Sequence, residues 1–509
     1  MTAPAFRRVL IANRGEIAVR IARGLRELGI ESVGICSTPD RDAPHALATD
    51  LTLDIGGETA LESYLDIAKV LEAAQRSGAE AIHPGYGFLS ENPRFARAVT
   101  EAGLVFIGPP AEAMLALGSK EKAKAAAVAA GVPVVPGFDA DEGDDGKLAA
   151  AAAQVGFPLL IKAVAGGGGK GMRLVRSAAD FPDALATARR EARSAFGDGQ
   201  VLLERYVHPA RHVEIQLIAD DHGEVVSLHE RECSVQRRHQ KVIEEAPSPV
   251  VDADLRARMG EAAVRIARHV GYRNAGTAEF LVDEKGAFYF LEVNTRRQVE
   301  HPVTELVTGV DLVHLQVHCA AGGKLADALA GRDLTPRGHA IEARIYAESP
   351  EHGYLPQAGL LQLVSEPVGP GIRVDSGVRS GQEVTVFYDP MLAKLIVHAP
   401  TRAAACDRMA QALRASVYLG IDTNVDFLRR IIEDEDFRAG RLRIDFLDRK
   451  PELAKGPEAS VPDLAYVAAL VAGLGASGPA VGSAAVAAAN GATTWHRVGA
   501  MRLWASDPA

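Results

Sequence analysis

Cysteine and aromatic residues are scarce in this sequence, and each shortage excludes classes of protein. The 4 cysteines lie far apart without CxxC spacing, which argues against a disulfide framework and against a zinc site. Aromatic residues make up only 5% of the chain, so flat stacking surfaces are few. The N-terminus lacks a charged-then-apolar signal region, and we therefore expect a reduced, cytoplasmic setting.

Basic residues are also in the minority, with 56 Lys and Arg against 66 Asp and Glu and a net charge of −10. A nucleic-acid binder needs a basic surface, so no nucleic-acid partner is expected. The uncharged stretch 464–495 is rich in Ala and Gly rather than Leu, Ile and Phe. This composition favours an Ala-rich helix with a flexible segment over a membrane span, and no membrane partner is expected.

The chain of 509 residues predicts about three domains at roughly 150 residues each. In the first hundred residues, helical patterns alternate with short apolar runs at 9–12, 32–36, 81–83 and 105–107. This βαβ order predicts a parallel sheet covered by helices. The turn after the first run lacks GxGxxG, so a dinucleotide site is not supported.

A second unit follows the Pro- and Gly-rich boundary at 131–137. We expect strands at 158–163, 172–176 and 201–204 and a helix at 181–196, with a glycine-rich tip at 166–171. Such a tip lets backbone N–H groups approach phosphate oxygens, although a flexible surface turn is the alternative. Lys162 lies in an apolar strand and needs an anion nearby, for which phosphate is the simplest partner.

A hairpin formed by strands 277–282 and 288–294 is the most informative local pattern. With its turn centred on Lys285–Gly286, Glu279 lies opposite Glu292, and Asn294 shares the Glu292 face. Facing carboxylates repel, so a cation should lie between them. These oxygen ligands suit Mg²⁺ held against phosphates, whereas a solvated charged face is the alternative.

Two basic segments complete the pattern. One is 295–301, directly after the hairpin, and the other is 231–241, which we expect to be a loop. A surface charge run is the usual explanation for such a cluster. Beside a magnesium–phosphate site, an anion pocket is the better interpretation.

Several segments together resemble biotin carboxylase, an ATP-grasp enzyme, between residue 9 and about residue 445. The matching segments are 9–17, 83–92, 166–172, 230–241, 294–302 and 338–344. The resemblance implies an α/β and α+β fold with an N-terminal doubly wound (Rossmann-like) domain at 1–118. An ATP-grasp core at 119–330 would carry a mobile glycine-rich lid at about 132–204. A C-terminal strand-rich domain at 335–445 would precede an Ala/Gly/Pro-rich tail at 446–509, which resembles the start of a carboxyltransferase-docking region.

The resemblance also implies a role for each matching residue. ATP would be bound by Lys120, Lys162, Gly166, Gly167, Gly168, Gly169, Glu204 and His212. Mg²⁺ or Mn²⁺ would be held by Glu279, Glu292 and Asn294. The substrate-binding residues would be Tyr86, Gln236, His239, Gln298 and Val299. The catalytic residues would be Lys241, Arg296, Arg344 and Glu300, the last as the base for bicarbonate.

The implied activity is ATP- and bicarbonate-dependent carboxylation of biotin through carboxyphosphate, as the first half-reaction of an acyl-CoA carboxylase. No Met-Lys-Met biotinylation sequence occurs, so we expect biotin on a separate carrier protein or domain. The other expected partners are a carboxyltransferase β-subunit and a second copy of the chain, in a homodimer or larger complex. The alternatives are a pyruvate or urea carboxylase module and another ATP-grasp ligase.

Arg297 departs from the family pattern, which has Leu or Ile at this position. A second guanidinium beside Arg296 could crowd the bicarbonate–biotin pocket, and it favours a catalytically impaired structural subunit as a further alternative. A side chain that points away from the pocket is the other reading of the same residue.

Overall fold

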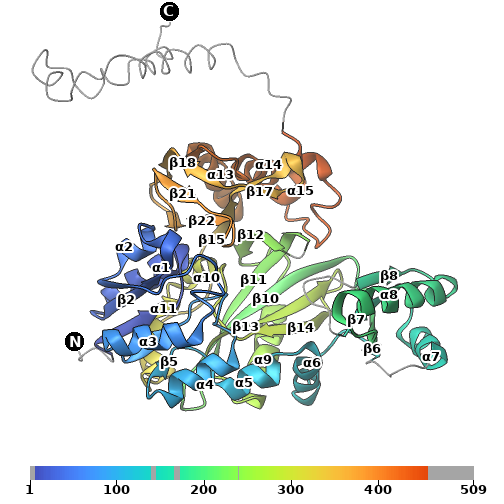
Figure 1. The fold of residues 1–509 in the computed structure, drawn as a ribbon. Coiled ribbons are helices and arrows are strands. Elements are labelled where there is room, and N and C mark those ends of the chain that lie inside the picture. The colour runs from blue at the N-terminus through green and yellow to red at the C-terminus, as the bar shows by residue number, and fades with distance from the viewer. Residues whose placement is uncertain (1–5, 139–144, 165–171, 239, 457–509) are drawn as a thin grey trace, which may run out of the picture. The chain divides into compact units, whose positions relative to one another are not determined.

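The N-terminal part contains a parallel sheet with the strand order β3-β2-β1-β4-β5, as expected for a doubly wound domain. The computed structural model describes residues 6–138, 145–164, 172–238 and 240–456 (Figure 1). The strands are β1 (Arg8–Ile11), β2 (Glu31–Cys36), β3 (Leu51–Asp54), β4 (Ala81–His83) and β5 (Val105–Phe106). We did not predict β3, whose partly exposed position at the sheet edge removes the apolar run typical of inner strands.

Local capping chemistry sets the limits of the N-terminal helices. In α3 (Ile67–Ser77) the Asp66 carboxylate accepts hydrogen bonds from two backbone N–H groups, and Gly78 ends the helix with a φ of 66°. The other helices here are α1 (Gly15–Glu27), α2 (Pro44–Ala48), α4 (Pro93–Glu101), α5 (Ala111–Leu117) and α6 (Lys120–Ala129). The apolar faces of α3, α4 and α5 pack against the strands, since Leu10, Val33 and Phe95 share one buried core.

A small antiparallel sheet has the order β6-β9-β7-β8. Its strands are β6 (Gly137–Phe138), β7 (Leu159–Ala163), β8 (Met172–Val175) and β9 (Val201–Arg205). Helices α7 (Asp145–Val155) and α8 (Phe181–Phe196) share its core. The predicted hairpin and helix are confirmed, because Lys162 pairs with Met172 and α8 has the expected bounds. The tip at 166–171 lies outside the described residues.

The largest sheet has eight strands in the order β14-β13-β10-β11-β12-β15-β22-β20, all antiparallel to their neighbours (Figure 1). The first five are β10 (Ala210–Ala219), β11 (Val225–Arg237), β12 (Gln240–Ala246), β13 (Asn274–Asp283) and β14 (Phe288–Asn294). The others are β15 (His339–Tyr346), β20 (Ile372–Ser376) and β22 (Met391–Ala399). Because β12 pairs with β15, this sheet continues across the expected boundary near residues 330–335.

The segment 231–241, which we expected to be a loop, instead forms the ends of β11 and β12, with Gln236 opposite Lys241. Its polar residues Arg231, Glu232, Ser234 and Gln236 are buried, and other buried polar groups pair with residues of this segment, as described below. A count of apolar residues cannot detect a strand of this kind.

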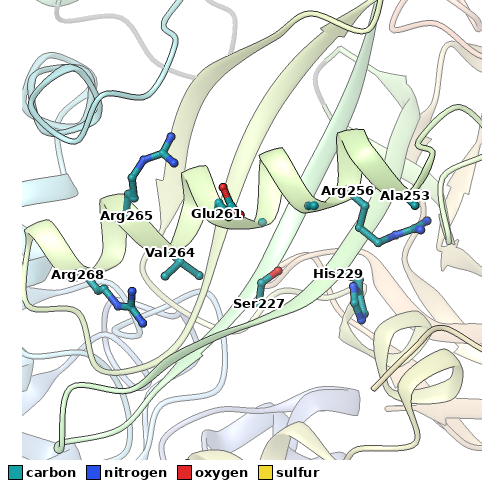
Figure 2. A pocket seen from close by; sticks show the side chains of 10 residues that line it. Ser227, His229, Ala253, Arg256, Glu261, Val264, Arg265 and Arg268 are labelled. Atoms are coloured by element: carbon teal, nitrogen blue, oxygen red, sulfur yellow. The ribbon is translucent and has the colours of Figure 1, made fainter. Parts of the chain in front are cut away.

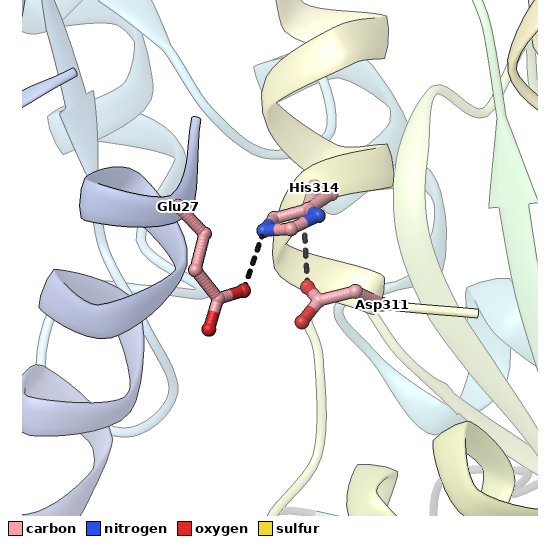
Figure 3. A group of neighbouring side chains, drawn as sticks. All are labelled: Glu27, Asp311 and His314. Atoms are coloured by element: carbon pink, nitrogen blue, oxygen red, sulfur yellow. Dashed lines mark hydrogen bonds and ion pairs between the residues drawn. The ribbon is translucent and has the colours of Figure 1, made fainter. Parts of the chain in front are cut away.

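Helices from several parts of the chain cover this sheet. Helix α9 (Ala253–His269) packs across β11, and arginines of α9 line a groove above Ser227 and His229 (Figure 2). Helices α10 (His301–Thr308), α11 (Leu312–Ala320) and α12 (Leu325–Ala328) follow β14. At the end of α1, Glu27 lies 3.2 Å from His314 of α11, and Asp311 caps α11 (Figure 3).

The remaining elements complete the C-terminal part. Helices α13 (Arg402–Ala415), α14 (Val425–Glu433) and α15 (Glu435–Arg438) share a core with β15 and β22. Short strand pairs join β16 (Glu348–Ser349) to β17 (Leu355–Pro356), β18 (Gly359–Leu361) to β21 (Gln382–Val384), and β19 (Leu363–Ser365) to β23 (Val417–Leu419). No helix within the described ranges is long and apolar enough to cross a bilayer. The uncharged stretch 464–495 lies outside them.

Candidate active site

The β13–β14 hairpin places Glu279 directly opposite Glu292, as predicted. Closer to the turn the pairing is shifted by one residue from the prediction, since Phe280 faces Phe290. A β-bulge lies between this pair and the pair of glutamates, where one strand has one more residue than the other. The turn itself is closed by Asp283, whose backbone N–H donates to the Ala287 carbonyl at 2.9 Å. The bulge therefore restores the predicted pairing where the carboxylates lie.

Glu279 lies in a dense polar environment. Its carboxylate accepts hydrogen bonds from Asn294 and Gln298, both at 2.8 Å, and from Lys241 at 2.9 Å. His212 Nε2 lies 3.0 Å from its other oxygen. Burial raises the pKa of Glu279, but Lys241 and His212 lower it well below its usual range. The carboxylate is therefore ionised and surrounded by donors.

Glu292 has the opposite electrostatic setting. Burial and the charge of Glu279 raise its pKa, and Lys120 opposes them. A divalent cation between the two strands would relieve this repulsion. The carboxylate oxygens of Glu279 and Glu292 and the amide oxygen of Asn294 are the donor types that Mg²⁺ and Mn²⁺ prefer, so the residues fit such an ion.

Lys241 is a buried cation shared by several carboxylates. Its Nζ donates to Glu214 at 2.5 Å, to Glu300 at 2.6 Å and to Glu279 at 2.9 Å. Burial lowers the pKa of Lys241, but these carboxylates raise it well above its usual value. Lys241 thus joins the predicted base to a predicted metal ligand through one ammonium group.

Glu300 also accepts a hydrogen bond at 2.9 Å from Arg344, whose Nε donates to Glu244 at 2.6 Å. Burial raises the pKa of Glu300, but Lys241, Arg344 and Arg231 together lower it well below its usual range. By contrast, burial raises the pKa of Glu244 to about 7. Glu300 is therefore an ionised carboxylate held between two cations.

Sequence reasoning missed the roles of Arg231 and Glu214. The fully buried Arg231 donates to Glu214 at 2.5 Å, to Gln216 at 2.7 Å and to Gln298 at 3.1 Å. It connects the 295–300 loop, defined as Thr295–Glu300, to the middle of the sheet. One signal was available, because His212, Glu214 and Gln216 alternate as polar residues along an otherwise apolar strand.

The predicted catalytic Arg296 and the predicted substrate-binding residues lie around this centre in different ways. Arg296 donates to Glu91 at 2.7 Å and to Asn294 at 3.1 Å. The Val299 carbonyl accepts a hydrogen bond from Lys394 at 2.9 Å. The Tyr86 ring centroid lies 5.9 Å from the same Lys394 ammonium, and its hydroxyl is buried without a partner in the described part of the chain.

The predicted nucleotide residues lie partly in the small sheet. Lys162 meets an anion as expected, but that anion is the Glu204 carboxylate, to which it donates a hydrogen bond. Lys120 is the first residue of α6, which Ser119 caps. Gly166, Gly167, Gly168, Gly169 and His239 lie outside the described residues.

Arg297 does not share the surroundings of its neighbours Arg296 and Gln298. Its side chain is fully buried, and the charges that act on it are those of Arg20, Glu305, Asp311 and Glu16. These groups belong to α1 and to the segment that starts with α10, whereas Arg296 and Gln298 contact Asn294 and Glu279. Of the two readings of Arg297, these surroundings therefore favour a side chain that points away from the anion pocket.

The architecture now defines a class of protein. A doubly wound domain, a small antiparallel sheet, and a large sheet carrying paired carboxylates form the scaffold of an ATP-grasp ligase. Three family models match the chain in order. They are the biotin carboxylase N-terminal domain at 5–114, the carbamoyl-phosphate synthase L chain ATP-binding domain at 119–328, and the biotin carboxylase C-terminal domain at 342–449.

Individual proteins agree with these models. A biotin carboxylase from Halalkalibacterium halodurans is 48% identical, over 89% of this chain and 99% of its own length. The mitochondrial methylcrotonoyl-CoA carboxylase α subunit of Rattus norvegicus is 48% identical over 86% of this chain, which spans 61% of that relative's length.

A solved structure gives the same result at the level of the fold. The biotin carboxylase domain dimer of Hydrogenobacter thermophilus 2-oxoglutarate carboxylase, in complex with MgADP, ADP and bicarbonate, is 42% identical with a TM-score of 0.82. The match covers 89% of this chain and 99% of that one. The chain belongs to the biotin carboxylase family, and the resemblance noted in its sequence is confirmed.

Proposed function

We propose that this chain carboxylates biotin with ATP and bicarbonate, as the first half-reaction of an acyl-CoA carboxylase. The observation that carries the proposal is the position of Glu300, ion-paired to Lys241 and Arg344 and linked through Lys241 to Glu279. A generic ATP-grasp ligase has no need of a base between two cations next to its metal site. Bicarbonate requires both the cations and the base, because it must bind as an anion and then lose its remaining proton.

Glu279, Glu292 and Asn294 would hold Mg²⁺ or Mn²⁺. When bound, such an ion neutralises charge on the ATP phosphates during attack by bicarbonate, a transfer that depends mainly on positioning and charge. The nucleotide would be oriented by Lys120, Lys162, Glu204 and His212. The segment Gly166–Gly169 would act as a lid over the bound ATP. Because the Lys162 ammonium donates a hydrogen bond to the Glu204 carboxylate in the structure, a phosphate would have to compete with that carboxylate for Lys162.

Glu300 would act as the base, and its strength would change during the reaction. Its two cations stabilise the carboxylate and make it a weak proton acceptor. A bicarbonate anion placed among Lys241, Arg296, Gln298 and Val299 would share those positive charges and raise the pKa of Glu300. Substrate binding would then itself activate the base.

The arginines would serve the second part of the reaction. Carboxyphosphate would break its C–O(P) bond to give CO₂ and phosphate, the phosphate would take the ureido N–H proton of biotin, and the ureido nitrogen would then attack CO₂. The ureido oxygen gains negative charge in that step, and the guanidinium of Arg296 would stabilise it as an oxyanion hole does. The residues that line the biotin side of the pocket would be Tyr86, Gln236, His239 and Arg344.

The partners belong to the same proposal. Biotin would arrive on a separate carrier, and a carboxyltransferase would receive the carboxyl group. A homodimer is supported by the dimeric Hydrogenobacter domain.

We also propose the domain limits 1–118, 119–330 and 335–445. A pyruvate carboxylase module is the alternative, and the carboxyltransferase partner distinguishes it. Since the charges that act on Arg297 are those of Arg20, Glu305, Asp311 and Glu16, we no longer take it to favour an impaired subunit.

The test is a measurement of ADP release with and without bicarbonate and free biotin. We expect bicarbonate-dependent ATP hydrolysis that biotin stimulates, and loss of that stimulation in Lys241→Ala. ATP hydrolysis that ignores both bicarbonate and biotin would contradict the proposal. Arg258→Ala, which removes an exposed ion pair on α9, is the control expected to retain full activity.

A further inference from the structure

The carboxylate of Glu91 joins the N-terminal domain to the 295–300 loop at two points. Its Oε2 accepts a hydrogen bond from Arg296 Nε at 2.7 Å, and its Oε1 accepts one from the backbone N–H of Thr295 at 2.9 Å. The Thr295 hydroxyl donates to the same Oε1 at 3.3 Å. One carboxylate therefore holds both the side chain of Arg296 and the backbone directly before it.

The turn that carries Glu91 is itself firmly placed in the N-terminal domain. The next residue, Asn92, caps α4 by accepting hydrogen bonds from two backbone N–H groups. Nearer to β4, the Asn13 amide donates to the carbonyls of Pro84 and Tyr86, both at 2.8 Å. These contacts fix the segment on either side of the turn, so Glu91 is a well-placed anchor for the loop.

The contact with Glu91 sets the direction of the whole Arg296 guanidinium. With Nε bound to Glu91, Nη2 donates to Asn294 Oδ1 at 3.1 Å and Nη1 donates to the Arg297 carbonyl at 3.3 Å. Of these three acceptors only Glu91 is charged, and hydrogen bonds between charged partners are the strong ones. Glu91 is therefore the main determinant of how the guanidinium lies.

Two carboxylates of the active site would otherwise attract the same guanidinium. Burial lowers the pKa of Arg296, but the charges of Glu91, Glu300 and Glu279 raise it above its ordinary value. Glu300 and Glu279 both already bind Lys241. Without Glu91, Arg296 would be drawn toward these two carboxylates, where it would neutralise the proposed base and occupy space proposed for bicarbonate.

The pair of Glu91 and Arg296 is only partly buried, since the two side chains are 41% and 21% exposed. Ion pairs with this degree of exposure contribute little to the stability of a fold. The contact therefore matters more for the orientation of Arg296 than for the free energy of unfolding.

We propose that Glu91 is a positioning residue, which holds Arg296 Nε and the Thr295 backbone so that the guanidinium serves the substrate pocket instead of pairing with Glu300. The inference rests on the proposed function, because Arg296 is assigned there to bicarbonate and to the ureido oxygen of biotin. It goes further by giving the N-terminal domain a part in the reaction through one carboxylate.

The first experiment measures ADP release at varied bicarbonate and biotin for Glu91→Gln, Arg296→Met and the double variant. Glutamine keeps the shape of Glu91, but its NH₂ group meets a second donor at either Thr295 or Arg296. Glu91→Gln should lower kcat/KM for bicarbonate about tenfold or more and leave the KM for ATP unchanged. In the Arg296→Met background the same change should have almost no effect, because no guanidinium remains to be oriented.

The second experiment measures hydrogen exchange in peptides that cover the 295–300 loop and does not depend on activity. Because Glu91 accepts the Thr295 backbone N–H, Glu91→Ala should speed exchange at this amide several-fold. The matched control is Glu101→Ala, since Glu101 is an exposed residue at the end of α4. This variant should leave both the exchange and the kinetics unchanged.

The possible results separate the two proposals. A Glu91→Gln effect as large in the Arg296→Met background as in the wild type would overturn the inference, since Glu91 would then act through another group. Unchanged exchange of the loop in Glu91→Ala would also overturn it. Absence of biotin-dependent turnover in the wild type would refute the proposed function instead, and the exchange experiment would still test whether Glu91 holds the loop.

Discussion

The ammonium group of Lys241 lies 2.6 Å from the carboxylate of Glu300, and both side chains are almost completely buried. A base held this closely by a cation is a poor proton acceptor until another anion takes part of that positive charge. The relationship implies that Glu300 matters for turnover rather than for nucleotide affinity. It also implies that replacing either partner leaves the other buried charge less compensated.

We therefore expect Glu300→Gln to lower kcat and kcat/KM for biotin carboxylation together, by about 10²-fold or more, with little change in the KM for ATP. The amide keeps the shape but accepts no proton. Steady-state assays with varied ATP and varied bicarbonate measure the difference. A variant with normal kcat and a raised KM for ATP would assign Glu300 to nucleotide binding.

Glu292 and Glu279 should differ when each is changed to glutamine. Glu279 is bound by Lys241, Asn294 and Gln298, so Glu279→Gln should reduce both the melting temperature and activity. Glu292 repels Glu279, so Glu292→Gln should preserve the melting temperature while raising the Mg²⁺ concentration needed for half-maximal activity. An unchanged Mg²⁺ titration would remove Glu292 from the metal site.

Arg231→Met should destabilise the protein by about 3–5 kcal/mol, because it leaves the buried Glu214 with one cation fewer. Thermal unfolding and ADP release should both decline. Arg258→Met is the matched control, since its pair with Asp254 is exposed and such pairs contribute little. A melting temperature equal to the control would mean that Glu214 is neutral or otherwise compensated.

His45 should contribute to acid sensitivity through the N-terminal domain. Burial lowers its pKa to about 4 from an ordinary 6.5, so the unfolded chain binds the additional proton first. Stability should then fall as pH decreases from about 6.5 to 4, and His45→Gln should remove part of that fall. Melting temperatures of both proteins over this range provide the measurement, and parallel curves would contradict the assignment.

Features governed by local alternation could be predicted from the sequence. The apolar runs of β1, β2 and β4 and the opposition of Glu279 and Glu292 depend on spacing within a few residues. The strand character of residues 231–241 could not, because its polar side chains are buried through partners such as Glu214 and Glu300, far away in the chain. The direction of Arg297 likewise depends on how the 295–300 loop packs against α1.

The pairing of β12 with β15 has a consequence for any attempt to divide this protein. Residues Ile243–Ala246 bond to Ala340–Ala343 by backbone hydrogen bonds, so a cut near residue 335 would run between two bonded strands. Each fragment would present a bare row of N–H and C=O groups, a surface prone to join any other strand. Fragments made at the apparent seam should therefore bind each other or precipitate, rather than behave as independent modules.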